Sequence, residues 1–144
     1  MIPLKNIIFD LHGVLFEYDL SIDSNKFKII QEGYNILNNC HAKSNCEIYA
    51  CTNWNNNIVE SLKKEFLDIM SIFKNIITPC QSGSKKPDHK IFMYIIEKHN
   101  LIPSECILID DQENNVKSAI EIGMNAIHAK DFNYVINQLK NYLR

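Results

Sequence analysis

The sequence predicts an α/β fold, a three-layer α/β/α sandwich in which helices cover both faces of a central parallel sheet. Two observations lead to this prediction. Short apolar runs with few charges alternate with amphipathic segments along the chain, and polar residues follow most of these runs. Strands that are apolar on both faces are typical of parallel sheets buried between helices. The 144 residues fit one domain, residues 1–144, because no repeat or linker divides them.

Five apolar runs are predicted to be the strands of this sheet, since each carries few charges and several end in polar residues or proline. They are residues 5–10, 46–53, 75–79, 105–111 and 124–129. Helices are predicted between them, because apolar residues recur at helical spacing. The helical segments are residues 26–38, with Phe27 and Leu37 on one face; 56–69; a helix opened by Asp88; 112–123, ended by Gly123; and a last helix with Phe132 to Leu143 on its apolar stripe.

The composition excludes several classes of protein. A net charge of −2 without blocks of like charge argues against nucleic-acid binding, and no apolar stretch approaches the length of a membrane span. Five cysteines show no CxxC pair and no zinc-like spacing, so we expect reduced thiols in a cytoplasmic protein. Since Arg144 is the sole arginine, a bound phosphate must be held by lysine, backbone N–H groups or a metal ion.

Polar residues that follow the predicted strands are the candidate functional residues. The carboxyl ends of parallel strands meet at one edge of a sheet, where ligands bind. The residues brought to this edge are Asp10, Thr52 with Asn53, Lys86 in the loop after the third strand, and Asp110 with Asp111. Each alone has an ordinary explanation as a cap, turn or solvated loop residue. Together, and in this order along the chain, they favour a functional site.

These residue types point to phosphoryl-transfer chemistry. Asp10 ends an apolar strand, and a carboxylate there can attack phosphorus and form an aspartyl-phosphate. Three neighbouring carboxylates would repel one another unless a cation joined them, and Mg²⁺ prefers oxygen ligands. Thr52 and the Asn53 backbone can donate hydrogen bonds to phosphate, and Lys86 supplies a positive charge. A bacterial receiver domain is disfavoured, because there the acidic pair follows the first strand and the phosphorylated aspartate the third.

Four short motifs resemble those of the haloacid dehalogenase-like (HAD) hydrolase superfamily, and the resemblance spans nearly the whole chain. They are FDLHGVL (9–15), CTN (51–53), KKP (85–87) and LIDDQENN (108–115), with most similarity to the branch of sugar-phosphate phosphatases and dehalogenases. The resemblance implies a Rossmann-like core, Asp10 as nucleophile, Thr52 as phosphate ligand and Lys86 as the lysine of the third motif. It also implies Asp111 as a magnesium ligand with Asp110 beside it. Asn115 stands where the fourth motif often has a further acid.

His12 is the first departure from the motifs of this superfamily. Its phosphatases have an aspartate two residues after the nucleophile, which protonates the leaving group and activates water while its backbone carbonyl binds the metal. His12 keeps that carbonyl, and an imidazole can carry a proton near neutral pH. The alternative is that His12 only packs against the following segment and that hydrolysis is crippled.

The second departure is that the chain has too few residues between its motifs for a cap domain. Members of the superfamily that act on small metabolites usually carry such a domain. Only 41 residues separate Asp10 from Thr52 and 33 separate Thr52 from Lys86, and the predicted helices and strands use most of them. We therefore predict a core without a cap, with residues 14–25 as a flap. Such an open site admits bulky substrates or is closed by a second copy in a homo-oligomer. Trp54 either lines the entrance or covers the next helix.

The sequence thus predicts a magnesium-dependent phosphatase that hydrolyses a phosphomonoester through an intermediate on Asp10. Its partner would be a phosphorylated small molecule or macromolecule. A catalytically impaired binding or regulatory module is the alternative, because His12 replaces the usual acid/base. A dehalogenase is a third reading, which the acidic pair disfavours.

Overall fold

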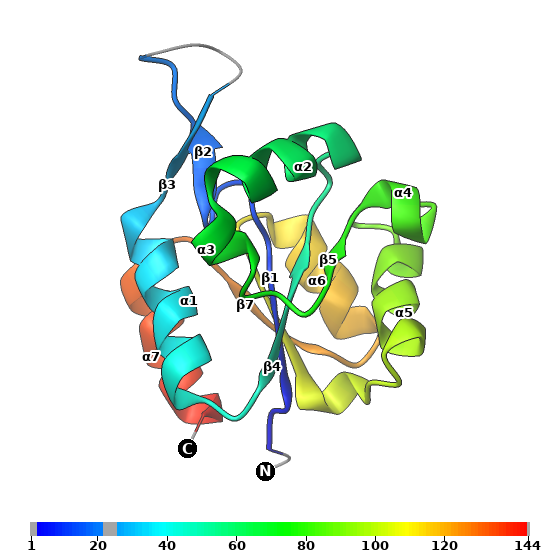
Figure 1. Ribbon diagram of the computed structural model, residues 1–144. Coiled ribbons are helices and arrows are strands. Elements are labelled where there is room, and N and C mark those ends of the chain that lie inside the picture. Colours follow the sequence, from blue (N-terminus) through cyan, green and yellow to red (C-terminus); the bar gives the residue numbers. More distant parts are fainter. Residues whose placement is uncertain (1–2, 22–25, 144) are drawn as a thin grey trace.

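The computed structural model describes residues 3–21 and 26–143 and has a five-stranded parallel sheet at its centre (Figure 1). The strand order is β5-β4-β1-β6-β7. The strands are β1 (Asn6–Phe9), β4 (Glu47–Cys51), β5 (Ile76–Ile77), β6 (Cys106–Asp110) and β7 (Asn125–His128). The predicted fold class and the five predicted strands are confirmed.

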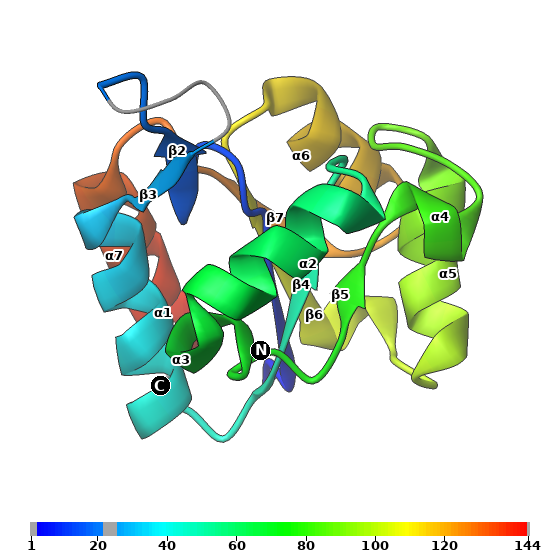
Figure 2. The same ribbon diagram turned by 45° about the horizontal axis from the view of Figure 1, so that its top comes forward.

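Helices cover both faces of this sheet, as the sequence predicts (Figures 1 and 2). One face carries α1 (Gln31–Lys43), α2 (Asn56–Glu65), α3 (Leu67–Met70) and α7 (Phe132–Tyr142). The other face carries α5 (His89–Lys98) and α6 (Glu113–Glu121), with the short α4 (Pro79–Ser82) against α5 and a 3-10 turn at Pro103–Glu105. No helix within the described residues is both long and apolar enough to cross a membrane.

The central strand β1 shows why its sequence must be apolar on both sides. Ile7 and Phe9 pack into the core beneath α1, α2 and α7, whereas Ile8 packs into the core beneath α5 and α6. All three side chains are fully buried. This alternation follows from the two-residue period of a strand. β1 also pairs with β4 on one side and β6 on the other, which fixes the position of the residue that follows it.

The predicted helix over residues 26–38 begins too early. Phe27–Ile29 form strand β3, which pairs antiparallel with β2 (Phe16–Tyr18), and α1 begins at Gln31. Phe27 fits the helical spacing of the sequence, but the strand pairing places it opposite Tyr18 on β2, where its ring is buried against that of Trp54. The predicted flap, residues 14–25, is therefore partly this hairpin, and residues 22–25 lie outside the described residues.

The predicted helix over residues 56–69 is also interrupted. Phe66, with φ −122° and ψ 51°, separates α2 from α3 and packs its ring 5.0 Å from that of Phe16. In the part of the chain that the structure describes, the connections on either side of β4 hold only this hairpin and the helices named above. No inserted cap domain is found among those residues.

Candidate active site

Asp10 lies directly after the central strand, at the carboxyl edge of the sheet. Its backbone N–H donates to the carbonyl of Ile109 at 2.9 Å, which extends the pairing of β1 and β6. Its Oδ1 accepts hydrogen bonds from the backbone N–H of Leu11 and from Lys86 Nζ, both at 2.9 Å. The chain order changes direction across the sheet at β1, and ligands bind at such switch points in parallel sheets.

Gly13 brings the turn after Asp10 against the end of β6. Its φ of +85° lies in the left-handed region, which glycine adopts without strain. A Cβ at this position would lie 2.2 Å from Asp111 Oδ2, far inside van der Waals contact. The sequence therefore needs glycine here so that the Asp111 carboxylate can approach the Asp10 loop.

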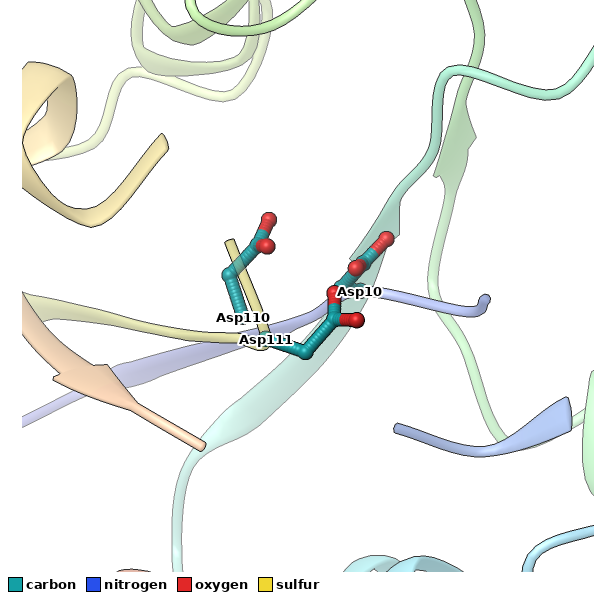
Figure 3. Close-up of side chains that lie close together, drawn as sticks. All are labelled: Asp10, Asp110 and Asp111. Atoms are coloured by element: carbon teal, nitrogen blue, oxygen red, sulfur yellow. The ribbon is translucent and has the colours of Figure 1, made fainter. Parts of the chain in front are cut away.

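Asp10, Asp110 and Asp111 place three carboxylates together at the ends of β1 and β6 (Figure 3). One oxygen from each lies within 4.8 Å of the others. Such a set of oxygen donors fits a hard divalent cation such as Mg²⁺. Asp111 is half-buried and opens toward the cavity, and its backbone carbonyl is 3.0 Å from His128 Nε2, at the end of β7.

Lys86 is buried and joins two of these carboxylates. Its Nζ donates to Asp10 Oδ1 at 2.9 Å, to Asp110 Oδ2 at 2.7 Å and to the carbonyl of Cys51 at 2.8 Å. Burial alone lowers the pKa of Lys86, but the Asp10 and Asp110 carboxylates reverse this and raise it above its usual range. The ammonium group therefore stays charged, and its position is fixed by three acceptors.

The charge of Asp10 depends on these neighbours. Burial raises the pKa of Asp10 well above its usual range, the Lys86 ammonium acts in the opposite direction, and the Asp110 carboxylate raises it again. A second cation beside Asp10 would favour the ionised form, which is the nucleophilic one. This electrostatic imbalance is a further reason why the acidic cluster suits a metal ion.

Asp110 is fully buried, and both of its oxygens already accept hydrogen bonds from protein donors. Asn115 Nδ2 lies 3.2 and 3.3 Å from the two oxygens, the backbone N–H of Gln112 donates at 2.9 Å, and Lys86 donates at 2.7 Å. Asn115 is thus brought to the site, as predicted, but it contacts Asp110. An acid at this position would face a buried carboxylate, whereas the amide can donate to it.

Asn53 has a role that the sequence does not reveal. Its Oδ1 accepts from the backbone N–H of Lys86 at 2.8 Å, and its Nδ2 donates to the backbone carbonyl of Lys86 at 3.0 Å. This pair of bonds ties the loop after β4 to the loop before α5. The backbone N–H of Asn53, the group predicted to bind phosphate, donates no hydrogen bond to another described residue.

Thr52 lies at the end of β4, almost fully buried, and its Oγ1 accepts from the backbone N–H of Trp54 at 3.0 Å. The threonine hydroxyl hydrogen remains available as a donor toward the cavity beside it. This cavity has a volume of about 110 Å³. It is lined by Asp10, His12, Thr52, Asn53, Trp54, Lys86, Asp111, Gln112 and Asn115.

His12 lies at the rim of this cavity, with an exposed side chain. Its ring stacks on that of Trp54, with centroids 5.0 Å apart and an interplanar angle of 21°. Trp54 therefore lines the entrance, which is one of the two expectations, and its ring packs against Tyr18 and Phe27 of the hairpin. Gln112 also lines the cavity, although the sequence pattern does not single it out.

All the residues predicted for the site meet at one edge of the sheet, around a cavity next to a buried lysine and a cluster of carboxylates. This arrangement defines an α/β protein with the elements of a hydrolase site. These are a buried carboxylate after the central strand, a lysine ammonium group held by three acceptors, and a cavity large enough for an anion. Comparison with known proteins gives the family.

Residues 18–123 match the family of haloacid dehalogenase-like hydrolases. The chain belongs to this hydrolase family. The matched range includes Thr52, Lys86, Asp110 and Asp111, and it begins after Asp10 and His12.

Two hydrolases of known name are similar to this chain in sequence. The chain is 32% identical over 144 residues to the flavin mononucleotide hydrolase 1 of Arabidopsis thaliana, covering 87% of this chain and 56% of that protein. It is 27% identical over 95 residues to the bifunctional epoxide hydrolase 2 of Rattus norvegicus, covering 62% of this chain and 17% of that protein. The chain thus spans little more than half of the first relative and a small part of the second.

Solved structures confirm the fold. A predicted HAD-like family hydrolase from Porphyromonas gingivalis has a TM-score of 0.74 at 20% identity, covering 96% of this chain and 98% of that one. A HAD family enzyme from Bacteroides thetaiotaomicron, in complex with magnesium and inorganic phosphate, has a TM-score of 0.69 at 18% identity, covering 86% and 93%. The L-2-haloacid dehalogenase of Xanthobacter autotrophicus has a TM-score of 0.70 at 12% identity, covering 85% and 76%.

Proposed function

We propose that this chain is a magnesium-dependent phosphatase that hydrolyses a phosphomonoester through an aspartyl-phosphate on Asp10. The observation that carries the proposal is the buried Asp10–Lys86–Asp110 cluster beside an anion-sized cavity. The flavin mononucleotide hydrolase relative and the magnesium and phosphate complex of the Bacteroides structure support it. Its partner would be a phosphorylated small molecule, and the prediction of a cytoplasmic location remains a prediction.

In the first step, Asp10 attacks the phosphorus atom and the bond to the leaving-group oxygen breaks. His12 donates a proton to that oxygen, so that a neutral alcohol departs. Thr52 and the Asn53 N–H donate to the phosphoryl oxygens, while Lys86 balances their charge. In the second step, His12 takes a proton from a water molecule that attacks the aspartyl-phosphate, which releases inorganic phosphate and restores Asp10.

Asp10, Asp111 and the backbone carbonyl of His12 would hold the magnesium ion, with Asp110 next to it. The ion would neutralise charge on the transferring phosphoryl group. No backbone hydrogen bond to another described residue uses the His12 carbonyl, which leaves this oxygen free as a ligand. Because the oxygens of Asp110 already accept from Lys86 and Asn115, we assign Asp110 chiefly to the positioning of Lys86.

The test is hydrolysis of para-nitrophenyl phosphate by the purified chain, with Mg²⁺ and with chelator. We expect turnover only with metal, loss of turnover in Asp10→Asn, and no change in Asp68→Asn, which alters an exposed carboxylate on α3. Brief reaction with labelled substrate should leave hydroxylamine-sensitive phosphate on the wild type. Metal-independent turnover, or full activity of Asp10→Asn, would overturn the proposal.

The alternative of an impaired binding module has one observation in its favour, the stacking of His12 on Trp54. If this contact fixes the imidazole away from the leaving group, labelled phosphate will accumulate on Asp10 without steady-state turnover. His12→Asp would then gain activity. Faster hydrolysis by the wild type than by His12→Asp would instead support proton transfer by the histidine.

A further inference from the structure

Four aromatic rings form a continuous surface beside the cavity, which we call the aromatic platform: His12, Tyr18, Phe27 and Trp54. Trp54 is at its centre, stacked on His12 at 5.0 Å and edge-on to Phe27 at 5.0 Å and Tyr18 at 6.0 Å. Tyr18 also meets the His12 ring edge-on at 5.3 Å. Such geometries are the preferred ones for aromatic pairs, so the rings hold one another in place.

The platform has a buried side and an open side. Phe27 and Trp54 are each 9% exposed and belong to the core beneath the hairpin. Tyr18 is 38% exposed, and His12 is also exposed. Packing alone accounts for the two buried rings. It does not account for the two exposed rings, His12, which lines the cavity, and Tyr18, which contacts the His12 ring.

The size of the cavity decides where the leaving group must lie. A volume of about 110 Å³ corresponds to only a few water molecules, at roughly 30 Å³ each. This is enough for a phosphoryl group, but it is well below the roughly 300 Å³ at which pockets begin to enclose an organic ligand. The organic part of a phosphomonoester must therefore rest outside the cavity, against its rim.

The rim offers two surfaces of different character. On the side of β6 the lining residues are Asp111, Gln112 and Asn115, which are polar or charged. On the opposite side are His12 and Trp54, continued by Tyr18 on the β2–β3 hairpin, which rises at this edge of the sheet (Figure 2). Stacking involves only the faces of the His12 ring, so the nitrogen atoms at its edge stay available for the proposed proton transfer.

We propose that the aromatic platform binds the leaving group of the substrate, and that this leaving group carries a planar aromatic or heteroaromatic ring. The ring would stack on the open face of His12 with its edge toward Tyr18. This inference rests on the proposed function, since it names the substrate class of the same site. It makes Tyr18 and Trp54 specificity-determining residues, Tyr18 by direct contact and Trp54 by holding His12 in place.

The kinetic test compares benzyl phosphate with cyclohexylmethyl phosphate, which have similar size and similar alcohol leaving groups but differ in planarity. We expect wild-type kcat/KM to be roughly tenfold higher for benzyl phosphate, a modest value for stacking on one ring. Tyr18→Leu should reduce this ratio severalfold, mainly through KM. Tyr134→Leu is the matched control, because Tyr134 is similarly exposed, at 44%, but lies on α7 outside the aromatic platform.

A binding test separates this inference from the proposed function. Trp54 is the single tryptophan, so its fluorescence reports on the platform. Benzyl phosphate should change the emission of the Asp10→Asn variant at lower concentration than cyclohexylmethyl phosphate does. Equal binding, or equal kcat/KM with an unchanged ratio in Tyr18→Leu, overturns the platform and leaves the phosphatase standing. If Asp10→Asn binds benzyl phosphate preferentially but the wild type neither hydrolyses it nor forms phospho-Asp10, the platform is supported and the phosphatase is refuted.

Discussion

Replacing Lys86 by methionine tests how the charges of the site are balanced. Methionine keeps most of the length of the side chain but removes the ammonium group from three acceptors, Asp10, Asp110 and the Cys51 carbonyl. The Lys86 side chain is 1% exposed, so solvent cannot replace the lost charge. Two buried carboxylates would then face each other without a positively charged partner, with only neutral donors such as Asn115 left to them.

The expected cost is about 3–5 kcal/mol in the free energy of unfolding, the usual result of leaving buried charges unpaired. Lys85→Met is the matched control, because Lys85 is exposed, and its effect should stay within about 0.5 kcal/mol. Urea unfolding followed by far-UV circular dichroism measures both values. Mg²⁺ at about 100 times its dissociation constant should restore about 2.7 kcal/mol to Lys86→Met if the ion binds only the folded chain.

The pH dependence of the Lys86→Met variant has a defined sign. Lys86 lowers the pKa of Asp10, so its removal raises that pKa further above the value in the unfolded chain. The folded variant then binds more protons than the unfolded one, and its stability rises as the pH falls from neutral toward about 4. The deficit relative to wild type should therefore shrink in this range. A deficit below about 1 kcal/mol at pH 7, or one that grows on acidification, would refute the electrostatic reasoning.

Three further predictions concern other contacts. Gly13→Ala should abolish most activity and cost about 1–3 kcal/mol, because of its positive φ and a Cβ placed 2.2 Å from Asp111 Oδ2; kinetics and urea unfolding measure this. Asn53→Ala removes two hydrogen bonds to the Lys86 backbone, so we expect a loss of about 1–3 kcal/mol by urea unfolding and a lower kcat. Burial and two nearby lysines lower the pKa of His99, so this histidine should contribute a loss of stability as the pH drops below about 6.5; in urea unfolding between pH 5 and 7.5, His99→Gln should lose less stability on acidification than the wild type.

Each of these three predictions has a control variant or a result that would contradict it. Asn137→Ala, at an exposed position on α7, should leave kcat unchanged, and an equal drop in both asparagine variants would argue against a specific role of Asn53. An active Gly13→Ala enzyme would mean that the Asp111 carboxylate moves away at little cost. An unaltered pH slope in His99→Gln would assign acid sensitivity to other groups.

The position of the candidate site is predictable from the sequence because it depends on a rule of topology. Asp10, Thr52 and Asp110 end strands, and parallel strands bring their carboxyl ends together whatever the intervening sequence is. Lys86 is predicted from its position in the loop after the third strand, and its KKP motif resembles the third motif of the superfamily. Neither inference required knowledge of a particular side-chain contact.

The hairpin and the role of Asn53 were not predictable in this way. Phe27 satisfies the spacing of a helix and of a strand alike, and its pairing partners on β2 decide between them. The two bonds from Asn53 to Lys86 join residues 33 positions apart. Nothing in the local sequence around either residue distinguishes this contact from an ordinary turn.

The central place of β1 also has a consequence for the order in which the protein can acquire its chemistry during synthesis. β1 is made before both of its neighbours: Asn6 pairs with Glu47 on one side and with Cys106, 100 residues on, at the other. Chains emerge N-terminal end first, so a nascent chain carries Asp10 long before it carries Asp110 and Asp111. The acidic cluster therefore forms only after β6 has been added, and shorter nascent chains hold an incomplete site with one exposed edge of β1.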